Sequence, residues 1–174
     1  MPKILENVRE RILEEAKRQL VEYGYGKTTV RSVAKSCEIS IGTLYNNFET
    51  KDMIVAHNML ESWQAALARM REFCKSADGE AAVKNIFEEI SDYSLKHKHI
   101  FDDKVAAKAF HAFSDKHNLL VDQLSVFIEP YCREAGYSDP SFAACFITEA
   151  LLSHGVKRID YAEISPIIKR LLRK

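Results

Sequence analysis

Apolar residues recur at three- and four-residue steps along most of the chain, which is the periodicity of helices that bury one face. With Gly, Pro and capping residues as boundaries, this pattern predicts helices over about residues 4–23, 28–37, 41–48, 51–74, 81–95, 100–113, 114–134, 139–158 and 165–172. The polar run at 96–99 is predicted to be a turn. No alternating strand pattern and no internal repeat is found, so we predict an all-α fold.

Two short helices near the N-terminus have the pattern of a helix-turn-helix pair. Thr28 or Thr29 can cap the first helix and Ser40 the second. Leu44 and Phe48 lie four residues apart and are expected to face the first helix. The opposite face of the second helix carries uncharged polar side chains, namely Thr43, Tyr45, Asn46 and Asn47. An apolar side for anchorage and a small polar side for base edges are what a recognition helix requires.

The residues in and around this pair resemble the N-terminal helix-turn-helix of TetR-type (TetR/AcrR) transcriptional regulators. The resemblance covers roughly residues 8–60 and is carried by Gly24-Tyr25, Thr28-Thr29-Val30, Val33-Ala34, Ser40-x-Gly42-Thr43-Leu44-Tyr45, Phe48 and Lys51. It implies a DNA-binding domain of residues 1–50, joined by a long helix to a helical ligand-binding and dimerisation domain of residues 51–174. One departure is Glu38, where the family usually has Gly. A positive φ at Glu38 costs on the order of 1 kcal/mol.

The side chains of the pair divide into groups that contact phosphates and groups that contact bases. Phosphate contacts are expected from Thr28 or Thr29, Arg31, Tyr45 and Lys51. Gly42 allows close approach to the groove, Thr43 can touch a thymine methyl or a base edge, and Asn46 can pair with adenine. The predicted DNA-contacting set is Thr28, Thr29, Arg31, Ser40, Gly42, Thr43, Tyr45, Asn46, Asn47 and Lys51. The alternative is that Thr28 or Thr29 only caps a helix, and that Arg31 and Lys51 are only solvated charges.

Composition and charge change this picture little. At 47% hydrophobic residues the chain can bury a sizeable core, and it contains no apolar run of the ~20 residues that a membrane span needs. The charged start argues against a signal peptide, and four cysteines without metal-type spacing are read as core thiols, with redox sensing as the alternative. We therefore expect a cytoplasmic protein.

The formal net charge of the chain is zero, so the electrostatic attraction of one copy to DNA phosphates is expected to be modest.

Regulators of this type usually bind a small molecule within their C-terminal helices, so the resemblance implies an effector. Its class is expected to be hydrophobic or planar, because the candidate lining is aromatic: Trp63, Phe87, Tyr93, Phe101, Phe110, His111 and Phe113. Each of these residues can instead be ordinary core. No histidine pair has zinc-site spacing, and no catalytic triad, carboxylate pair or Gly-rich loop is found. We expect no metal, no cofactor and no enzymatic activity.

Pairing of two copies is expected because one recognition helix reads only a few base pairs. Residues 142–156 are apolar on more than one side, as in a deeply buried or interface helix. In the TetR type the last long helices of two copies form a four-helix bundle, which implies an interface at Phe142, Ala143, Phe146, Ala150, Leu151, Ser153 and His154. Burial within one monomer is the alternative.

These observations predict a homodimeric transcriptional regulator, a repressor that a small ligand releases from a palindromic operator on double-stranded DNA. The sequence leaves two alternative functions open. One is an architectural DNA-binding protein of the same fold that does not respond to a ligand, and the other is a helical interaction module that does not bind DNA.

Overall fold

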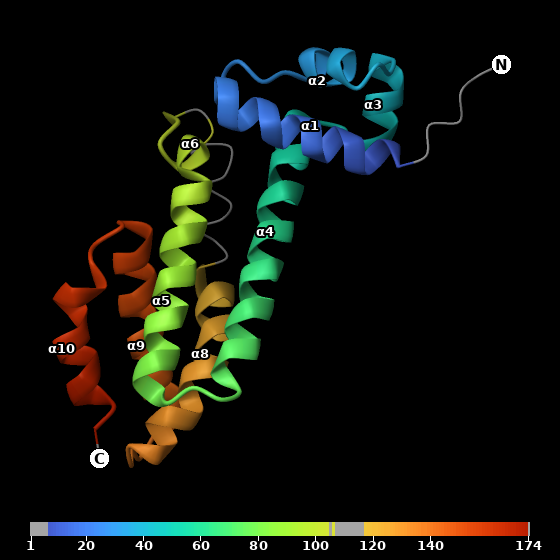
Figure 1. Ribbon diagram of the computed structural model, residues 1–174. Coiled ribbons are helices and arrows are strands. Elements are labelled where there is room, and N and C mark those ends of the chain that lie inside the picture. Colours follow the sequence, from blue (N-terminus) through green and yellow to red (C-terminus); the bar gives the residue numbers. More distant parts are fainter. Residues whose placement is uncertain (1–6, 105, 107–116, 174) are drawn as a thin grey trace. The chain divides into compact units, whose positions relative to one another are not determined.

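The computed structural model describes residues 7–104, 106 and 117–173, and the regular elements within these ranges are helices (Figure 1). They are α1 (Val8–Tyr23), α2 (Val30–Ser36), α3 (Ile41–Asn47), α4 (Lys51–Cys74), α5 (Gly79–Lys96), α6 (Lys98–Phe101), α8 (His117–Glu134), α9 (Pro140–Val156) and α10 (Tyr161–Leu171). The all-α prediction is confirmed. The chain divides into two compact units, residues 1–62 with 97–110 and residues 63–96 with 111–174.

Helix α10 begins at Tyr161, four residues earlier than predicted. The Asp160 carboxylate caps it by accepting the N–H of Ala162 at 2.9 Å. Pro166, which was expected at the start, lies inside the helix. Because proline has no N–H, the carbonyl of Ala162 loses its usual donor, and the hydroxyl of Ser165 donates to that carbonyl at 3.4 Å instead. The polar run at 96–99 is also more helical than predicted, since α6 starts at Lys98.

The core of the first unit is formed where α1, α2, α3 and the start of α4 meet. Leu44 and Phe48 are 0% and 1% exposed, as the sequence predicted, and Tyr25 is also buried. The buried cluster consists of Ile12, Ala16, Val33, Ala34, Cys37, Leu44, Phe48 and Ile54. At roughly 1.5–3 kcal/mol for each large apolar side chain, this burial is the main stabilisation of α2 and α3, which are too short to be stable alone.

A buried glutamine ties α1 to both ends of α2. Gln19 is 2% exposed, and its Nε2 donates to Ser36 Oγ at 3.2 Å. Its Oε1 accepts the hydroxyl of Ser32 at 2.6 Å. These bonds satisfy a buried amide whose unpaired burial would cost about 1–3 kcal/mol, so they fix how α2 lies on α1.

Two arginines of α1 reach the C-terminal ends of the helix-turn-helix pair. Arg11 donates from Nη2 to the carbonyl of Cys37 at 2.7 Å, at the end of α2. Arg9 donates from Nη1 to the carbonyl of Asn47 at 3.3 Å, at the end of α3, and its guanidinium lies 4.4 Å from the ring centroid of Phe48. Each guanidinium therefore supplies a donor and a positive charge where carbonyls lack helical partners.

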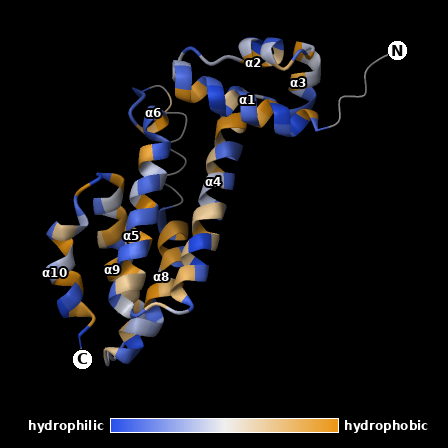
Figure 2. Cartoon of the chain, in the orientation of Figure 1, coloured by the Kyte–Doolittle hydropathy of each residue, from blue (hydrophilic) through white to orange (hydrophobic). Residues whose placement is uncertain are grey.

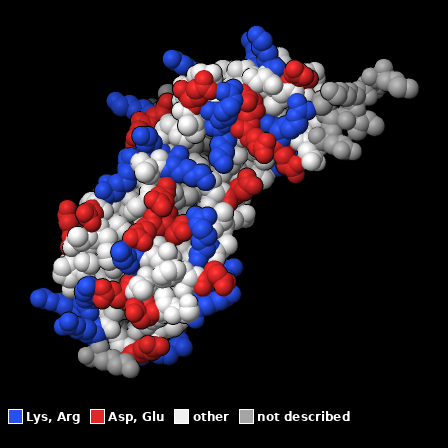
Figure 3. Space-filling view, in the orientation of Figure 1, with Lys and Arg blue, Asp and Glu red and all other residues white. Residues whose placement is uncertain are grey.

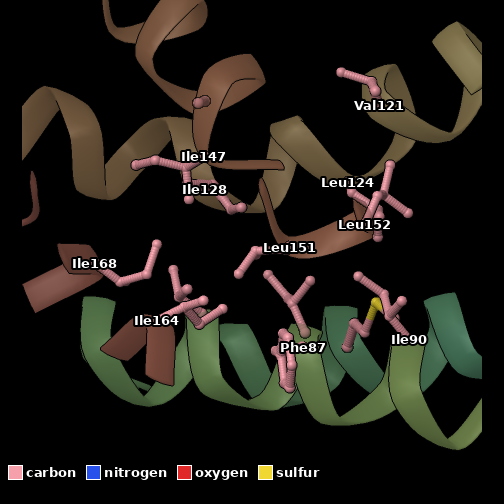
Figure 4. Close-up of a cluster of buried hydrophobic side chains, with 14 of the residues drawn as sticks. Phe87, Ile90, Val121, Leu124, Ile128, Ile147, Leu151, Leu152, Ile164 and Ile168 are labelled. Carbon is pink, nitrogen blue, oxygen red and sulfur yellow. The ribbon is translucent and has the colours of Figure 1, made fainter. Parts of the chain in front are cut away.

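The core of the second unit brings α5, α8, α9 and α10 together (Figure 4). Phe87 and Ile90 of α5 meet Leu151 of α9 in this cluster. The approach of α5 to α9 is close at Gly155, where an added Cβ would lie 2.7 Å from Ile90 Cγ2. Helix α9 is apolar around much of its surface (Figure 2), as the sequence indicated. None of the described helices is long and apolar enough to cross a membrane.

Helix α4 has the predicted bounds. Helical periodicity also predicts a buried apolar seam through Met53, Leu60, Trp63 and Met70 of this helix, and that prediction is wrong for the first two residues. Met53 and Leu60 are about half exposed, whereas Ile54, Val55 and Met59 are buried. The first two turns therefore bury a neighbouring stripe of the same helix. Asn58 lies on that stripe and donates from Nδ2 to the carbonyl of Leu13 in α1 at 3.1 Å.

The turn between α2 and α3 depends on one left-handed residue, Glu38, with φ 53°. The N–H of Glu38 donates to the carbonyl of Lys35 at 3.1 Å, and the N–H of Ile39 donates to the carbonyl of Ala34 at 3.0 Å. This bond pattern is a Schellman motif, in which glycine is the usual left-handed residue. Glu38 therefore does have the positive φ whose cost the sequence raised.

Replacing Glu38 by Gly should stabilise the protein. Relief of a left-handed β-carbon, about 1–2 kcal/mol, exceeds the added chain entropy of glycine, about 0.5–1 kcal/mol. The free energy of unfolding, measured by urea denaturation, should therefore rise by roughly 0.5–1 kcal/mol. Glu38→Ala is the matched control, because it removes the carboxylate and keeps the strain. A Glu38→Gly protein no more stable than Glu38→Ala would contradict the argument.

Candidate nucleic-acid interface

Helix α3 exposes one uncharged face. At about 100° per residue, four residues share an arc of about 140° that does not include the buried Leu44. All four are exposed: Ile41, Gly42, Tyr45 and Asn46. The sequence IGTLYNN of α3 contains no acidic or basic residue, so this face offers amide, hydroxyl and apolar groups only.

Side-chain caps fix the starts of both short helices. Thr29 and Ser32 form a capping box, in which Thr29 Oγ1 accepts the N–H of Ser32 at 3.0 Å and Ser32 Oγ accepts the N–H of Thr29 at 3.0 Å. Ser40 Oγ accepts the N–H of Thr43 at 2.9 Å. The predicted caps are confirmed for Thr29 and Ser40, and each stabilises its helix by about 1 kcal/mol.

Two of the predicted polar residues lie at the edge of the exposed face. Thr43 is partly buried, and its hydroxyl lies 2.8 Å from Ser40 Oγ in a shared hydrogen bond. Asn47 is also partly buried, and its Nδ2 donates to the carbonyl of Thr43 at 2.9 Å. Their side chains are thus held against α3 itself, so any contact they make is at the rim of the surface.

Gly42 is an exposed helical glycine that the fold does not require. An added Cβ would have Ser40 Oγ at 3.7 Å as its nearest neighbour, which is ordinary van der Waals contact. Glycine inside a helix costs about 1 kcal/mol relative to alanine. No contact within the first unit therefore requires glycine at position 42.

The residues that flank α3 divide into exposed and buried groups. Thr29, Arg31 and Lys35 are exposed. Thr28 is 1% exposed, and its hydroxyl donates to the carbonyl of Gly24 at 2.9 Å. The predicted phosphate contact of the Thr28 side chain is therefore wrong, because the side chain closes the turn after α1 and has no exposed group to offer.

Lys51 is occupied inside the first unit. Its ammonium donates to the carbonyl of Tyr25 at 2.9 Å and lies 3.5 Å from the centroid of the Tyr25 ring. Burial lowers the pKa of Lys51, and burial together with the hydrogen bond to Asp52 raises the pKa of Tyr25. These contacts anchor the start of α4 to the turn after α1. A phosphate contact by Lys51 stays a prediction.

Charge gives this surface little long-range attraction. Basic and acidic side chains are interspersed over the visible face of the molecule (Figure 3). Arg31 and Lys35 are exposed on α2, while Glu38 and Glu49 are exposed just before and after α3. The exposed charges beside α3 therefore supply little positive field.

Ile41 is exposed although its spacing along the sequence indicates an inward position. It precedes Leu44 by three residues and Phe48 by seven, which is the spacing of an inward face, yet it is 42% exposed and lies outside the buried cluster of the first unit. Spacing alone does not reveal this exposure, because Ile41 lies at the edge of the buried stripe that contains Leu44 and Phe48.

The residues predicted to line a ligand pocket have several fates. Trp63 and Phe87 are buried in the core of the second unit, with Tyr93 packed beside them. The rings of Trp63 and Tyr93 meet edge to face at 5.2 Å, and Trp63 Nε1 donates to Gln123 Oε1 at 2.9 Å. Phe101 is 39% exposed in the first unit. Phe110, His111 and Phe113 lie outside the described residues.

Two surface cavities are bounded by described residues of the second unit, and neither contains a residue predicted for the ligand. One, of about 360 Å³, is lined by charged side chains that include Glu80, Glu134 and Lys169. The other, of about 240 Å³, is apolar and is lined by Phe142 and Phe146 among others. No group of His, Cys, Asp and Glu side chains suited to a metal ion occurs in residues 7–104, 106 and 117–173.

The predicted pairing surface is only partly exposed. Ala143 and Leu151 are 7% and 0% exposed and belong to the core of their own chain, so their assignment to a dimer interface is wrong. The remaining predicted residues lie on the outer side of α9 and are exposed or partly buried: Phe142, Phe146, Ala150, Ser153 and His154. On α8, Leu119 and Val126 are also exposed. Contact between α8 and α9 includes the pair His117 Nε2 and Glu149 Oε2 at 2.6 Å.

Comparison with known proteins finds a family match within the first unit. Residues 12–57 match the bacterial regulatory proteins of the tetR family. The HTH-type transcriptional regulator UidR of Escherichia coli (strain K12) is 39% identical over 64 residues, which are 37% of this chain and 33% of UidR. The chain thus covers about a third of the length of this curated relative.

Solved structures extend the likeness to the whole fold. A transcriptional regulator from Cytophaga hutchinsonii ATCC 33406 has a TM-score of 0.66 and 19% identity, covering 94% of this chain and 93% of that chain. Thermus thermophilus FadR, a TetR-family repressor in complex with lauroyl-CoA, has a TM-score of 0.62 and 19% identity, covering 94% and 92%. Residues 12–57, which include α2 and α3, are therefore similar to the DNA-binding helix-turn-helix of the tetR family, and the chain shares the fold of these solved regulators.

Proposed function

We propose that the chain is a homodimeric transcriptional repressor that binds a palindromic operator and releases it when a small hydrophobic or planar ligand binds to the second unit. The observation that carries the proposal is the exposed, uncharged face of α3. This face includes Gly42, a glycine that packing within the first unit does not require. Such a face fits the major groove, where base edges present hydrogen-bonding groups and thymine methyls.

The contacts divide by position. Ser40 and Thr29 hold the helix starts, and Arg31 and Tyr45, both exposed, supply phosphate contacts beside the groove. Gly42 lets the backbone approach, and Asn46 pairs with adenine. Thr43, Asn47 and Lys51 contribute at the rim, because part of their hydrogen-bonding capacity is used within the first unit.

Ligand release is supported by the continuity of α4 and by one structural relative. Helix α4 is a single run of 24 residues that contributes to both units, so a change in the second unit has a direct covalent path to the helix-turn-helix. A ligand that binds one arrangement of this helix better shifts the population toward it. FadR of Thermus thermophilus binds lauroyl-CoA in the same fold, which favours a hydrophobic effector here. The test is to measure release of the operator in the presence of a panel of metabolites. If no compound releases the operator, the role of an architectural DNA-binding protein is favoured instead.

Gly42→Ala separates binding from folding. The added methyl meets only Ser40 Oγ in the free protein and removes a helical glycine, so the free energy of unfolding should rise by roughly 0.5–1 kcal/mol. The same methyl would stand between α3 and the groove. Affinity for a duplex selected from random sequences, measured by fluorescence anisotropy, should fall at least about tenfold, which is roughly 1.4 kcal/mol.

The exposed Gly26 offers the matched control for this substitution. It too has room for a Cβ, with no atom within 4 Å, and lies outside α3. Gly26→Ala should therefore bind the selected duplex as the unmodified protein does. Unchanged affinity in Gly42→Ala would contradict the placement of α3 in the groove, and failure to select any duplex would favour an interaction module.

Pairing through the outer faces of α8 and α9 can be tested with Phe146→Glu. Phe146 is 60% exposed, and in a two-fold symmetric interface each substitution counts twice. Losing the burial of two phenylalanines removes about 3–6 kcal/mol, so the dimer dissociation constant should rise by roughly 10²–10⁴ in sedimentation equilibrium. Ile167→Glu is the control, since Ile167 is 61% exposed on α10, outside the α8 and α9 faces. Equal effects of both substitutions would contradict this interface.

A further inference from the structure

The outward arc of α3 combines an apolar side chain with an amide. Ile41 is 42% exposed on the first turn, and Asn46 is exposed on the second. Between them lie the bare backbone at Gly42 and the exposed ring of Tyr45. Single exposed apolar residues are common on proteins and need no explanation. Ile41 is different because it adjoins a glycine whose missing side chain the fold does not explain.

The chemistry of these side chains restricts which bases they can read. Guanine is usually read by arginine or lysine on O6 and N7, and α3 contains neither residue. Asparagine pairs with N6 and N7 of adenine, and an apolar side chain packs on the C5 methyl of thymine. The exposed groups of α3 therefore match A·T pairs better than G·C pairs.

We propose that Ile41 reads the C5 methyl of a thymine and Asn46 reads an adenine, so that each half-site presents A·T pairs to α3. This inference rests on the proposed function and makes it more specific. Five residues of helix rise separate Ile41 from Asn46, about 7.5 Å, which corresponds to about two base-pair steps of ~3.4 Å. The two readings are therefore assigned to A·T pairs about two steps apart, with Gly42 against the groove between them.

The test uses a duplex selected from random sequences and replaces its thymines one position at a time by deoxyuridine, which keeps base pairing and lacks the methyl. Loss of one buried methyl at about 0.8 kcal/mol corresponds to about a fourfold weaker dissociation constant, and to about fifteenfold when both half-sites are changed. One symmetric position should show this loss with the unmodified protein. Ile41→Ala should bind the selected duplex less tightly and should be insensitive to deoxyuridine at that position.

Asn46 is tested in the same way with 7-deazaadenine, which lacks the N7 acceptor. One adenine position should lose about fivefold with the unmodified protein and nothing further with Asn46→Ala. Val21→Ala is the matched control for Ile41→Ala, because Val21 is 68% exposed on α1, outside the α3 face. Its affinity and its deoxyuridine sensitivity should equal those of the unmodified protein. Thermal unfolding of each variant confirms that it is folded.

Two results would overturn the inference. If a duplex is selected and no thymine position is sensitive, or if Ile41→Ala keeps the full sensitivity, the reading of the methyl by Ile41 is wrong while the proposed function stands. If no duplex is selected at all, both the inference and the proposed function fail.

Discussion

Burial of Leu44 and Phe48 is the constraint on which the proposed activity depends. Helix α3 has seven residues, too few to be stable in isolation, so it depends on Leu44 and on Phe48, the residue that follows it, to fill the core between α1 and α2. The same two side chains determine the rotation of α3 and thereby which residues face outward. Gln19, Arg9 and Arg11 then bind the ends of the two short helices to α1, so the outward face is presented by a braced element.

Local features of the first unit were predictable because they depend on neighbours in sequence. Thr29 and Ser40 are capping residues at the starts of α2 and α3, and Glu38 adopts the left-handed conformation that the turn between these helices requires. Choice among adjacent residues was less predictable. Thr28 and Thr29 have the same chemistry, and only the packing of the turn after α1 decides that Thr28 is buried and Thr29 is the cap.

Long-range geometry explains the other errors. On α4, two neighbouring stripes both carry apolar residues, and the partner helix selects Ile54 and Met59 over Met53 and Leu60. On α9, apolar residues nearly surround the helix, so periodicity could not tell Leu151, which is core, from Phe146, which is exposed. The arginine contacts from α1 to the carbonyls of α2 and α3 bridge 26 and 38 residues and leave no local signal.

The mixture of positive and negative charges beside α3 has a consequence for the proposed DNA binding. Non-specific attraction to phosphates scales with the number of positive charges, so the first unit would gain little from it. The proposed operator binding would instead depend on contacts that only the right bases supply. Uncharged side chains and a bare backbone give those contacts at short range. In the proposed dimer, a second copy of α3 would compensate for the small surface that one copy can offer.

The central claim, that α3 lies in the major groove with its uncharged face toward the bases, is tested most directly by a crystal structure of the dimer with a selected operator duplex. The account predicts Gly42 within van der Waals contact of the groove floor, with Leu44 and Phe48 still buried. Coordinates in which α3 lies away from the duplex, or in which a different helix occupies the groove, would contradict it.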